Sequence, residues 1–517
     1  MMIRSRRAFL GDAARGALTL AGAPAILSHL GCGPKRKRPN ILFAISDDQS
    51  YPHTSANGDP VVKTPAFDRV AANGILFTNA ISGSPGCAPS RATILTGRAH
   101  WQLEEAGTHA SFFPRRLKVF PELLAAAGYH TGHTGKGAGP ANFDGSGWQH
   151  NPAGPPFQER QFSETPPGIR NTDYAANFDD FLRARPEDQP FCFWYGASEP
   201  HRDFHEGAGL ASGKRLQDVV VPKFLPDCDV VRSDILDYYC EIEWFDRQLG
   251  RMLESLEQAG ELDNTIVVVT SDNGMAFPRA KATMFEYGIH MPLAVSWPAG
   301  CPGGRTVDDL ISFADFAPTL LEAASVEAPA ETTGRSFLDV LRAGKSGTVD
   351  ATRNRAYSGR ERHSHARYDN LGYPARALRT PEYLYIRNFA PDRYPAGDPD
   401  RFFDIDDCPS KSYLLEHRDQ AGVRELFEAT CGKQPAELLY DIRRDPACLE
   451  NLATSAAHSA TVQALRQEME QTLTAQGDSR LTGNGDVWES YPRFNTMRPE
   501  LGGFAERGQY NPKYQKL

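Results

Sequence analysis

The stretch Asn40-Ile41-Leu42-Phe43-Ala44-Ile45-Ser46-Asp47-Asp48 decides the fold of this chain. Its apolar core is continuous, as expected for a strand that is buried on both faces of a parallel sheet. The same pattern returns at 191–195 and 265–270, and helical stretches lie between the strands, notably at 120–127 and 235–259. Alternating buried strands and helices predict an α/β fold, in which helices cover both faces of a large, mostly parallel sheet.

Polar side chains follow each of these strands. Asp47 and Asp48 follow the first strand, Asp272 and Asn273 the third, and Glu199-Pro200-His201-Arg202 the one between. Ligands of open α/β sheets bind beyond the carboxyl ends of the strands, so these groups could converge. Their oxygens are hard ligands that suit calcium or magnesium rather than zinc. Adjacent aspartates alone would be explained equally well by a helix cap or a turn, but two such clusters favour a metal site.

Length and net charge limit the possible domain organisation and the possible ligands of this protein. A chain of 517 residues should hold one large domain and a smaller one. We place the boundary near 344–350, which gives a catalytic domain at 37–346 and a C-terminal subdomain with a tail at 347–517. A net charge of −9 gives no support to nucleic-acid binding, and an anionic substrate would need a locally basic pocket.

The first 36 residues are expected to be a targeting segment. Ser5-Arg6-Arg7-Ala8-Phe9-Leu10 resembles a twin-arginine export signal, which predicts the twin-arginine machinery as a partner and a periplasmic or extracellular location. The apolar run at 17–27 is shorter than the roughly 20 residues that a membrane span needs. His29 interrupts a lipoprotein box before Cys32, so lipid anchoring is not expected either. In an exported protein, disulfides are permitted, and Cys408, Cys431 and Cys448 could supply one.

Residues 87 to 98 read Cys-Ala-Pro-Ser-Arg-Ala-Thr-Ile-Leu-Thr-Gly-Arg. The simple interpretation is a cysteine in a turn before a helix, because Pro89 fits a first helical position. The whole stretch, however, resembles the signature of type I sulfatases. In that family a maturase converts the cysteine to formylglycine, whose hydrate is the nucleophile. The resemblance therefore implies that Cys87 is modified and does not act as a thiol.

The resemblance also implies an architecture. The family has an alkaline-phosphatase-like sandwich with a small C-terminal α+β subdomain that carries an antiparallel sheet. Glu437-Leu438-Leu439-Tyr440-Asp441, followed by Asp445-Pro446 and Glu450-Asn451-Leu452, looks like part of that subdomain, and 377–388 is expected to form one of its hairpins.

The residues of the site follow from the same resemblance. Asp47, Asp48, Asp272 and Asn273 match the metal ligands, with matured Cys87 completing a site for one ion, calcium rather than magnesium. Arg91 matches the arginine that steadies formylglycine, Lys136 and Lys281 match cations that contact sulfate, and His201 matches a histidine near the leaving-group oxygen. A lone lysine or histidine is ordinarily a surface or core residue, so each assignment depends on its place in the motif order.

One position departs from the family pattern. Many sulfatases read Gly-Lys-x-His, whereas this chain has Ala138 where the histidine belongs. That histidine usually assists the hydroxyl whose deprotonation ejects sulfate. His133, His363 or His365 could substitute for it, or the step could use water.

Several segments are similar to the heparan N-sulfatases in particular, among them 199–202, 221–226 and 272–278. The basic residues Arg362, His363, His365 and Arg367 either rim the pocket and bind an anionic sugar or form an exposed polar loop. Three functions stay open. The first is a sulfatase that acts on N-sulfated glucosamine or on another sulfated saccharide, the second a phosphate or phosphonate ester hydrolase, and the third a non-catalytic saccharide-binding relative, suggested by Ala138.

Overall fold

The computed structural model describes residues 38–399, 401–495 and 497–502. The twin-arginine segment, including Arg6, Arg7 and Cys32, lies outside the described residues. Within those ranges, no helix is both long enough and apolar enough to cross a membrane.

The larger sheet of the described residues has eight strands, in the order β3-β4-β1-β5-β6-β2-β7, with β8 paired to β2. Most of its pairs are parallel, as predicted, and β6 runs antiparallel to both of its neighbours. The strands are β1 (Asn40–Ser46), β2 (Ile75–Ile81), β3 (His130–Gly135), β4 (Phe191–Gly196), β5 (Thr265–Ser271), β6 (His290–Ser296), β7 (Arg305–Val307) and β8 (Ile311–Ser312).

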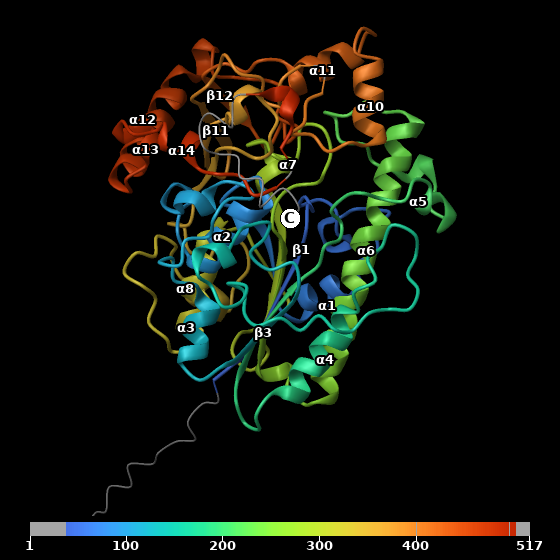
Figure 1. The fold of residues 1–517 in the computed structure, drawn as a ribbon, viewed down its shortest axis with the longest axis vertical. Helices are drawn as coiled ribbons and strands as arrows, with labels where there is room; N and C mark the ends of the chain where they lie inside the picture. The colour runs from blue at the N-terminus through green and yellow to red at the C-terminus, as the bar shows by residue number, and fades with distance from the viewer. Residues whose placement is uncertain (1–37, 400, 496, 503–517) are drawn as a thin grey trace, which may run out of the picture. The chain divides into compact units, whose positions relative to one another are not determined.

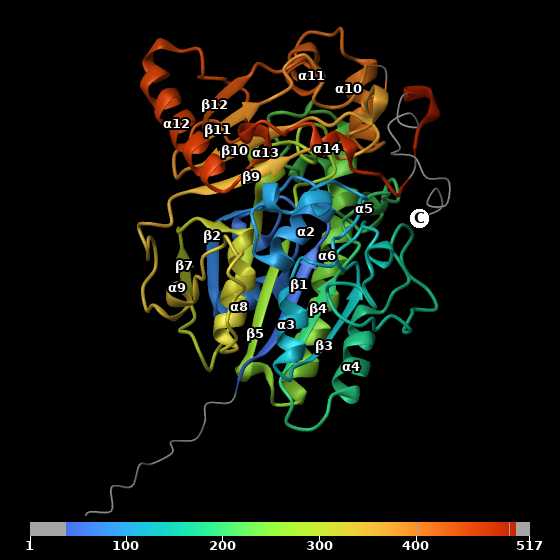
Figure 2. The same ribbon diagram turned by 60° about the vertical axis from the view of Figure 1, so that its left-hand side comes forward.

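Strand β1 is apolar from Ile41 to Ile45 because it contributes to two cores. Ile41 and Phe43 pack in one core with side chains from α2, α3 and α8, whereas Leu42 and Ala44 pack in another with side chains from α1, α4 and α6. Figures 1 and 2 show these helices on opposite faces of the sheet. The helices of this part are α1 (Pro65–Asn73), α2 (Cys87–Thr96), α3 (Phe120–Ala126), α4 (Tyr174–Ala184), α5 (Ala208–Ala211), α6 (Asp229–Gln258), α7 (Glu286–Ile289), α8 (Phe316–Ala323) and α9 (Leu338–Arg342).

A second sheet follows in the sequence. Its four strands are antiparallel, in the order β12-β11-β10-β9, and the hairpin predicted at 377–388 is formed by β10 and β11. Figure 2 shows this sheet beyond the carboxyl ends of the parallel strands. Its elements are β9 (Ala356–Arg360), β10 (Ala375–Arg379), β11 (Tyr383–Asn388), β12 (Glu437–Asp441), α10 (Pro409–Glu416), α11 (Val423–Cys431), α12 (Ser459–Ala475), α13 (Ser479–Thr482) and α14 (Val487–Ser490).

Two expectations need correction. Helix α6 begins at Asp229 rather than at 235, because the polar run at 232–234 interrupts the apolar pattern although Val231 already lies on the buried face. The described cysteines are all free thiols, so no disulfide links Cys408, Cys431 and Cys448. Cys431 and Cys448 are buried in separate apolar clusters, which keeps these two side chains apart.

Candidate active site

The acidic residues meet because their strands are neighbours. Strands β1 and β5 pair in parallel with Ser46 opposite Ser271, so the residues that follow leave the sheet side by side. The backbone N–H of Asp48 donates to Asp272 Oδ1 at 3.1 Å. Asp48 itself adopts a left-handed conformation with φ of 71°, which is uncommon for a residue other than glycine and recurs at functional sites.

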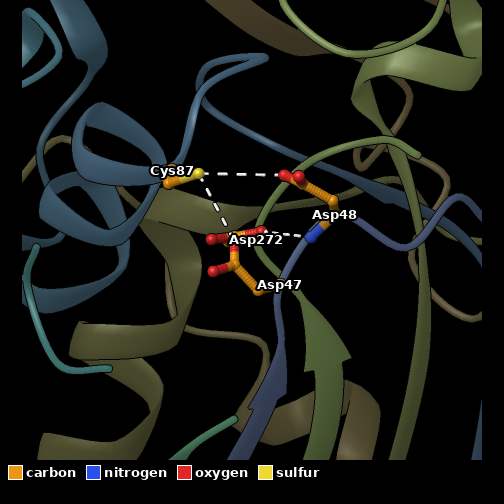
Figure 3. A group of neighbouring side chains, drawn as sticks. All are labelled: Asp47, Asp48, Cys87 and Asp272. Carbon is orange, nitrogen blue, oxygen red and sulfur yellow. Dashed lines mark hydrogen bonds between the residues drawn. The ribbon is translucent and has the colours of Figure 1, made fainter. Parts of the chain in front are cut away.

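Cys87 reaches this cluster from the first residue of helix α2. Its buried Sγ lies 3.3 Å from Asp47 Oδ1 and 3.7 Å from Asp48 Oδ1. Figure 3 shows the sulfur pointing at these two carboxylates, with Asp272 beside them. One potential ligand atom from each of Asp47, Asp48, Cys87 and Asp272 falls within 4.8 Å of all the others. The structure thus brings together residues from three separate segments.

The chemistry of the cluster fits a hard cation. Asn273 Nδ2 donates to Asp48 Oδ1 at 2.7 Å, while the buried Oδ1 of Asn273 accepts no hydrogen bond from any described residue. A buried polar atom without a partner is costly unless something else binds it. Three carboxylates and this amide oxygen form a ligand set that calcium or magnesium prefers. The predicted ligands therefore fit the predicted metal.

Three cationic side chains surround the acids. Arg91, one turn after Cys87, donates from Nε to Asp272 Oδ2 at 2.7 Å and from a terminal nitrogen to the backbone oxygen of Lys136 at 2.7 Å. Lys136 forms an ion pair with Asp47. Lys281 Nζ lies 2.6 Å from Asp48 Oδ2. All three cations predicted for the site thus border the acidic cluster.

His201 lies on the same side of the cluster as Lys281. Its Nδ1 donates to the backbone oxygen of Arg202 at 2.6 Å, which leaves Nε2 as the acceptor that faces Lys281 Nζ at 3.1 Å. Lys281 also donates to Asp406 Oδ2 at 2.9 Å. Sequence reasoning missed Asp406, because the acidic run Asp404-Ile405-Asp406-Asp407 carries no signal that distinguishes a site residue from a solvated one.

The surroundings of Cys87 disfavour thiol chemistry. Burial, and next the Asp47 carboxylate, raise the pKa of the Cys87 thiol well above its ordinary value. A neutral thiol is a poor nucleophile, and reactive cysteines ordinarily occupy electropositive, partly exposed positions. The carboxylates around Cys87 therefore favour the neutral form of its thiol.

The basic stretch at 362–367 is enclosed rather than exposed. Arg362 donates to the backbone oxygens of residues 491 and 492, Arg367 pairs with Asp404 at 2.8 Å, and His365 Nδ1 accepts from the backbone N–H of Arg498 at 2.8 Å. These three side chains are buried, so the stretch is not the exposed polar loop that was the alternative to a pocket rim. A role of Arg362, His363, His365 and Arg367 in saccharide binding stays a prediction.

Ala138 is buried, and its backbone N–H donates to Asn151 Oδ1 at 3.0 Å. Of the suggested substitutes for the family histidine, His133 turns its Nδ1 to the backbone oxygen of residue 154 at 2.8 Å. His363 instead packs against the turn before Cys87, since a Cβ added to Gly86 would lie 2.9 Å from His363 Nδ1. His363 is therefore the candidate that the structure leaves beside the cluster.

Comparison with known proteins agrees with this geometry. The model of the family described as Sulfatase matches residues 39–326, more than half of the chain. The chain belongs to the sulfatase family. A second family model, described as N-sulphoglucosamine sulphohydrolase, C-terminal, matches residues 279–391 of this sulfatase.

Similar curated proteins are also sulfatases. A human N-sulphoglucosamine sulphohydrolase is 27% identical over 86% of this chain and 91% of its own length. An ulvan-active sulfatase of Formosa agariphila is 28% identical over 86% of this chain and 76% of its own. An N-acetylglucosamine-6-O-sulfatase of Bacteroides thetaiotaomicron is 30% identical over 59% of this chain and 71% of its own. The protein is therefore a sulfuric ester hydrolase.

Solved structures show the same fold. One, described as a complex with its substrate D-glucosamine-2-N,6-O-disulfate, superposes with a TM-score of 0.62 and 22% identity over 87% of this sulfatase and 99% of the other chain. The phosphonate monoester hydrolase of Agrobacterium radiobacter gives a TM-score of 0.58 and 18% identity over 86% of this chain and 97% of its own. The expected alkaline-phosphatase-like fold is confirmed.

Proposed function

We propose that this sulfatase removes the N-sulfate group from N-sulfoglucosamine in saccharides of the heparin or heparan type. The observation that carries the proposal is the match of residues 279–391 to the C-terminal model of N-sulphoglucosamine sulphohydrolases, because the matched segment includes Lys281 in the site. The human relative with that activity in its name aligns over 86% of the chain, which adds support.

We propose that Asp47, Asp48, Asp272, Asn273 and matured Cys87 hold one calcium ion. When bound, the ion would polarise the sulfate group and favour the ionised form of the hydrated aldehyde at position 87. The formylglycine hydrate would supply one hydroxyl for attack on sulfur and a second hydroxyl through which the sulfate is released.

The remaining side chains orient the substrate and move a proton. Lys136 and Lys281 lie beside different carboxylates of the cluster, so their ammonium groups can bind different oxygens of one sulfate group. His201 directs Nε2 into the site because its Nδ1 is held by a backbone oxygen. In its protonated form that nitrogen can donate the proton that the leaving atom takes up as its bond to sulfur breaks.

An O-sulfatase activity is the second candidate. The relative with 30% identity is named for the 6-O-sulfate of N-acetylglucosamine, and esters and sulfamates need the same nucleophile and metal. A phosphate or phosphonate monoesterase is a further alternative, since the fold is shared with such an enzyme.

The test is sulfate release from N-sulfoglucosamine, from 6-O-sulfoglucosamine and from defined heparin disaccharides, with an aryl phosphate as a fourth substrate. We expect the N-sulfated sugar to have the highest kcat/KM, and Cys87→Ala to abolish all release. Release from the 6-O-sulfated sugar alone would replace the proposal with an O-sulfatase, and faster turnover of the aryl phosphate would replace it with a phosphatase.

We also propose that the protein is exported by the twin-arginine route to the periplasm or beyond, after a formylglycine-generating maturase has acted on Cys87. Twin-arginine export carries folded proteins, and Cys87 is buried in the folded chain, so the modification has to precede export. A form without residues 1–36, retained in the cytoplasm, should still carry the aldehyde at position 87. Mass spectrometry of its peptides measures this.

A further inference from the structure

A segment from the C-terminal half contributes one carboxylate to the site. Asp406 lies between β11 and α10, and its Oδ2 accepts the hydrogen bond from Lys281. Its side chain keeps 32% of its surface exposed, whereas the side chain of Lys281 keeps 4%. Among the described residues, none donates a hydrogen bond to Oδ1 of Asp406. One oxygen of this carboxylate is therefore available to a ligand.

The chain upstream of Asp406 is firmly anchored. Asp404, two residues earlier, is buried and pairs with Arg360 at 2.9 Å and Arg367 at 2.8 Å. It also accepts hydrogen bonds from the backbone N–H of Ser364 at 3.0 Å and from its hydroxyl at 2.9 Å. Part of the basic stretch around residue 365 thus serves to hold this loop.

The chain downstream of Asp406 is anchored to the residue that follows His201. Ser410 donates from its hydroxyl to Asp234 Oδ2 at 2.6 Å. The guanidinium of Arg202 binds both oxygens of the same aspartate, at 2.7 and 2.9 Å. A bidentate pair of this kind fixes orientation as well as distance. His201 and Asp406 both lie within hydrogen-bonding distance of Lys281 Nζ, and the segments that carry them share Asp234 as an anchor.

A free carboxylate oxygen at this place restricts what can bind beside it. It repels the oxygens of a sulfate group, since both are negatively charged, and it attracts hydrogen-bond donors and cations. It therefore suits the leaving group, near which His201 is expected to act. The linking oxygen of a sulfate ester carries no hydrogen, whereas the nitrogen of a sulfamate carries an N–H and becomes an ammonium group after release. Only the sulfamate offers this carboxylate a donor on the leaving atom itself.

We propose that Asp406 is a specificity-determining residue, which accepts a hydrogen bond from the N–H of the leaving amino group and so favours sulfamates over sulfate esters. The proposal deepens the proposed N-sulfatase function and depends on it for the natural substrate. Asp406 recognises amino sugars, and it does so through the nitrogen atom of the sugar.

The test compares Asp406→Asn with Asp407→Asn, a matched control one residue away. The Asp407 side chain is 90% exposed, pairs only with Lys411 among the described residues and makes no contact with Lys281. For Asp406→Asn we expect kcat/KM on N-sulfoglucosamine to fall roughly ten- to hundredfold, the range of a hydrogen bond to a charged group, and kcat/KM on 6-O-sulfoglucosamine to change less than about threefold. The control should leave both values unchanged.

A binding measurement distinguishes failure of the Asp406 inference from failure of the proposed N-sulfatase function. Glucosamine and glucose differ only at C2, where glucosamine carries an ammonium group and glucose a neutral hydroxyl, and each is used as a competitor of whichever sulfated sugar the enzyme hydrolyses. We expect glucosamine to inhibit the unmodified protein more strongly than glucose, and Asp406→Asn to remove the difference.

Two results would overturn the inference. An equal loss on both substrates in Asp406→Asn would mean that the carboxylate only positions Lys281 and His201. Equal inhibition by glucosamine and glucose would mean that no amino group is recognised. If the N-sulfated sugar is not hydrolysed at all but glucosamine still competes through Asp406, the N-sulfatase proposal fails while the recognition of the amino group stands. Circular dichroism of each variant shows whether it is folded.

Discussion

Arg91 Nε donates a hydrogen bond of 2.7 Å to Asp272 Oδ2, and both side chains are completely buried. Arg91 lies on α2, one turn after Cys87, whereas Asp272 follows β5. The same guanidinium also binds the backbone oxygens of residues 136 and 137, at 2.7 and 3.2 Å. One side chain therefore ties together the helix that carries Cys87, the acidic cluster and the loop that carries Lys136.

The substitution Arg91→Lys keeps the charge but cannot reach all three groups at once. Because at least one of the buried oxygens that Arg91 binds would be left without a hydrogen bond, we expect a loss of roughly 1–3 kcal/mol in the free energy of unfolding. Sulfate release should fall as well, since Asp272 and Lys136 lose a common support. Chemical denaturation measures the first effect, with the exposed Arg183→Lys as control. Wild-type stability in Arg91→Lys would contradict the role given to this contact.

The modification of Cys87 predicts a single altered cysteine. Mass spectrometry of the protein, produced with a formylglycine-generating maturase, should find aldehyde in the peptide that contains residue 87. The peptide with Cys192, which is buried in β4 and touches no acidic cluster, should keep its thiol and serves as the internal control. An intact thiol at position 87 together with full sulfatase activity would exclude the formylglycine mechanism.

Removal of the metal should weaken both activity and stability. Treatment with a chelator is expected to abolish sulfate release and lower Tm, and calcium should restore both. Calcium at a hundredfold excess over its Kd should stabilise the fold by about 2.7 kcal/mol. In Asp48→Asn the calcium-dependent shift in Tm should shrink, because one carboxylate ligand is lost. A Tm that does not respond to chelator or calcium would refute the metal site.

The burial of Glu241 should make the stability of the fold depend on pH, whether or not the metal is bound. Burial, and next the neighbouring Glu199, raise its pKa from 4.5 to about 8. A carboxyl group with a raised pKa in the folded state binds its proton more tightly there than in the unfolded chain. The free energy of unfolding therefore decreases as pH rises from about 4.5 to about 8.

The variant Glu241→Gln cannot ionise. Its Tm should therefore equal or fall below that of the wild type at pH 4.5 and exceed it at pH 8.5, as thermal unfolding at the two values will measure. The same difference in Tm at both values would show that Glu241 titrates normally in the folded protein.

The sequence alone determined the central strands and most of the site. Strand β1 is recognisable because both of its faces are apolar, and parallel neighbours must bring residues after 46 and after 271 to one edge. The Cys87 motif is likewise local, since a single helix carries both Cys87 and Arg91. Periodicity and motif order are properties of short segments and can be read before folding.

Only the tertiary structure decided where Asp406 lies and whether the basic stretch at 362–367 is buried or exposed. Asp406 reaches Lys281 because buried ion pairs at Asp404 and a shared contact at Asp234 fix the loop from both ends. Arg367, which could have been an exposed sugar ligand, is used as one of those anchors. An arginine or aspartate has the same pattern in the sequence whether it faces solvent or a buried partner, and the partner is supplied by a distant part of the chain.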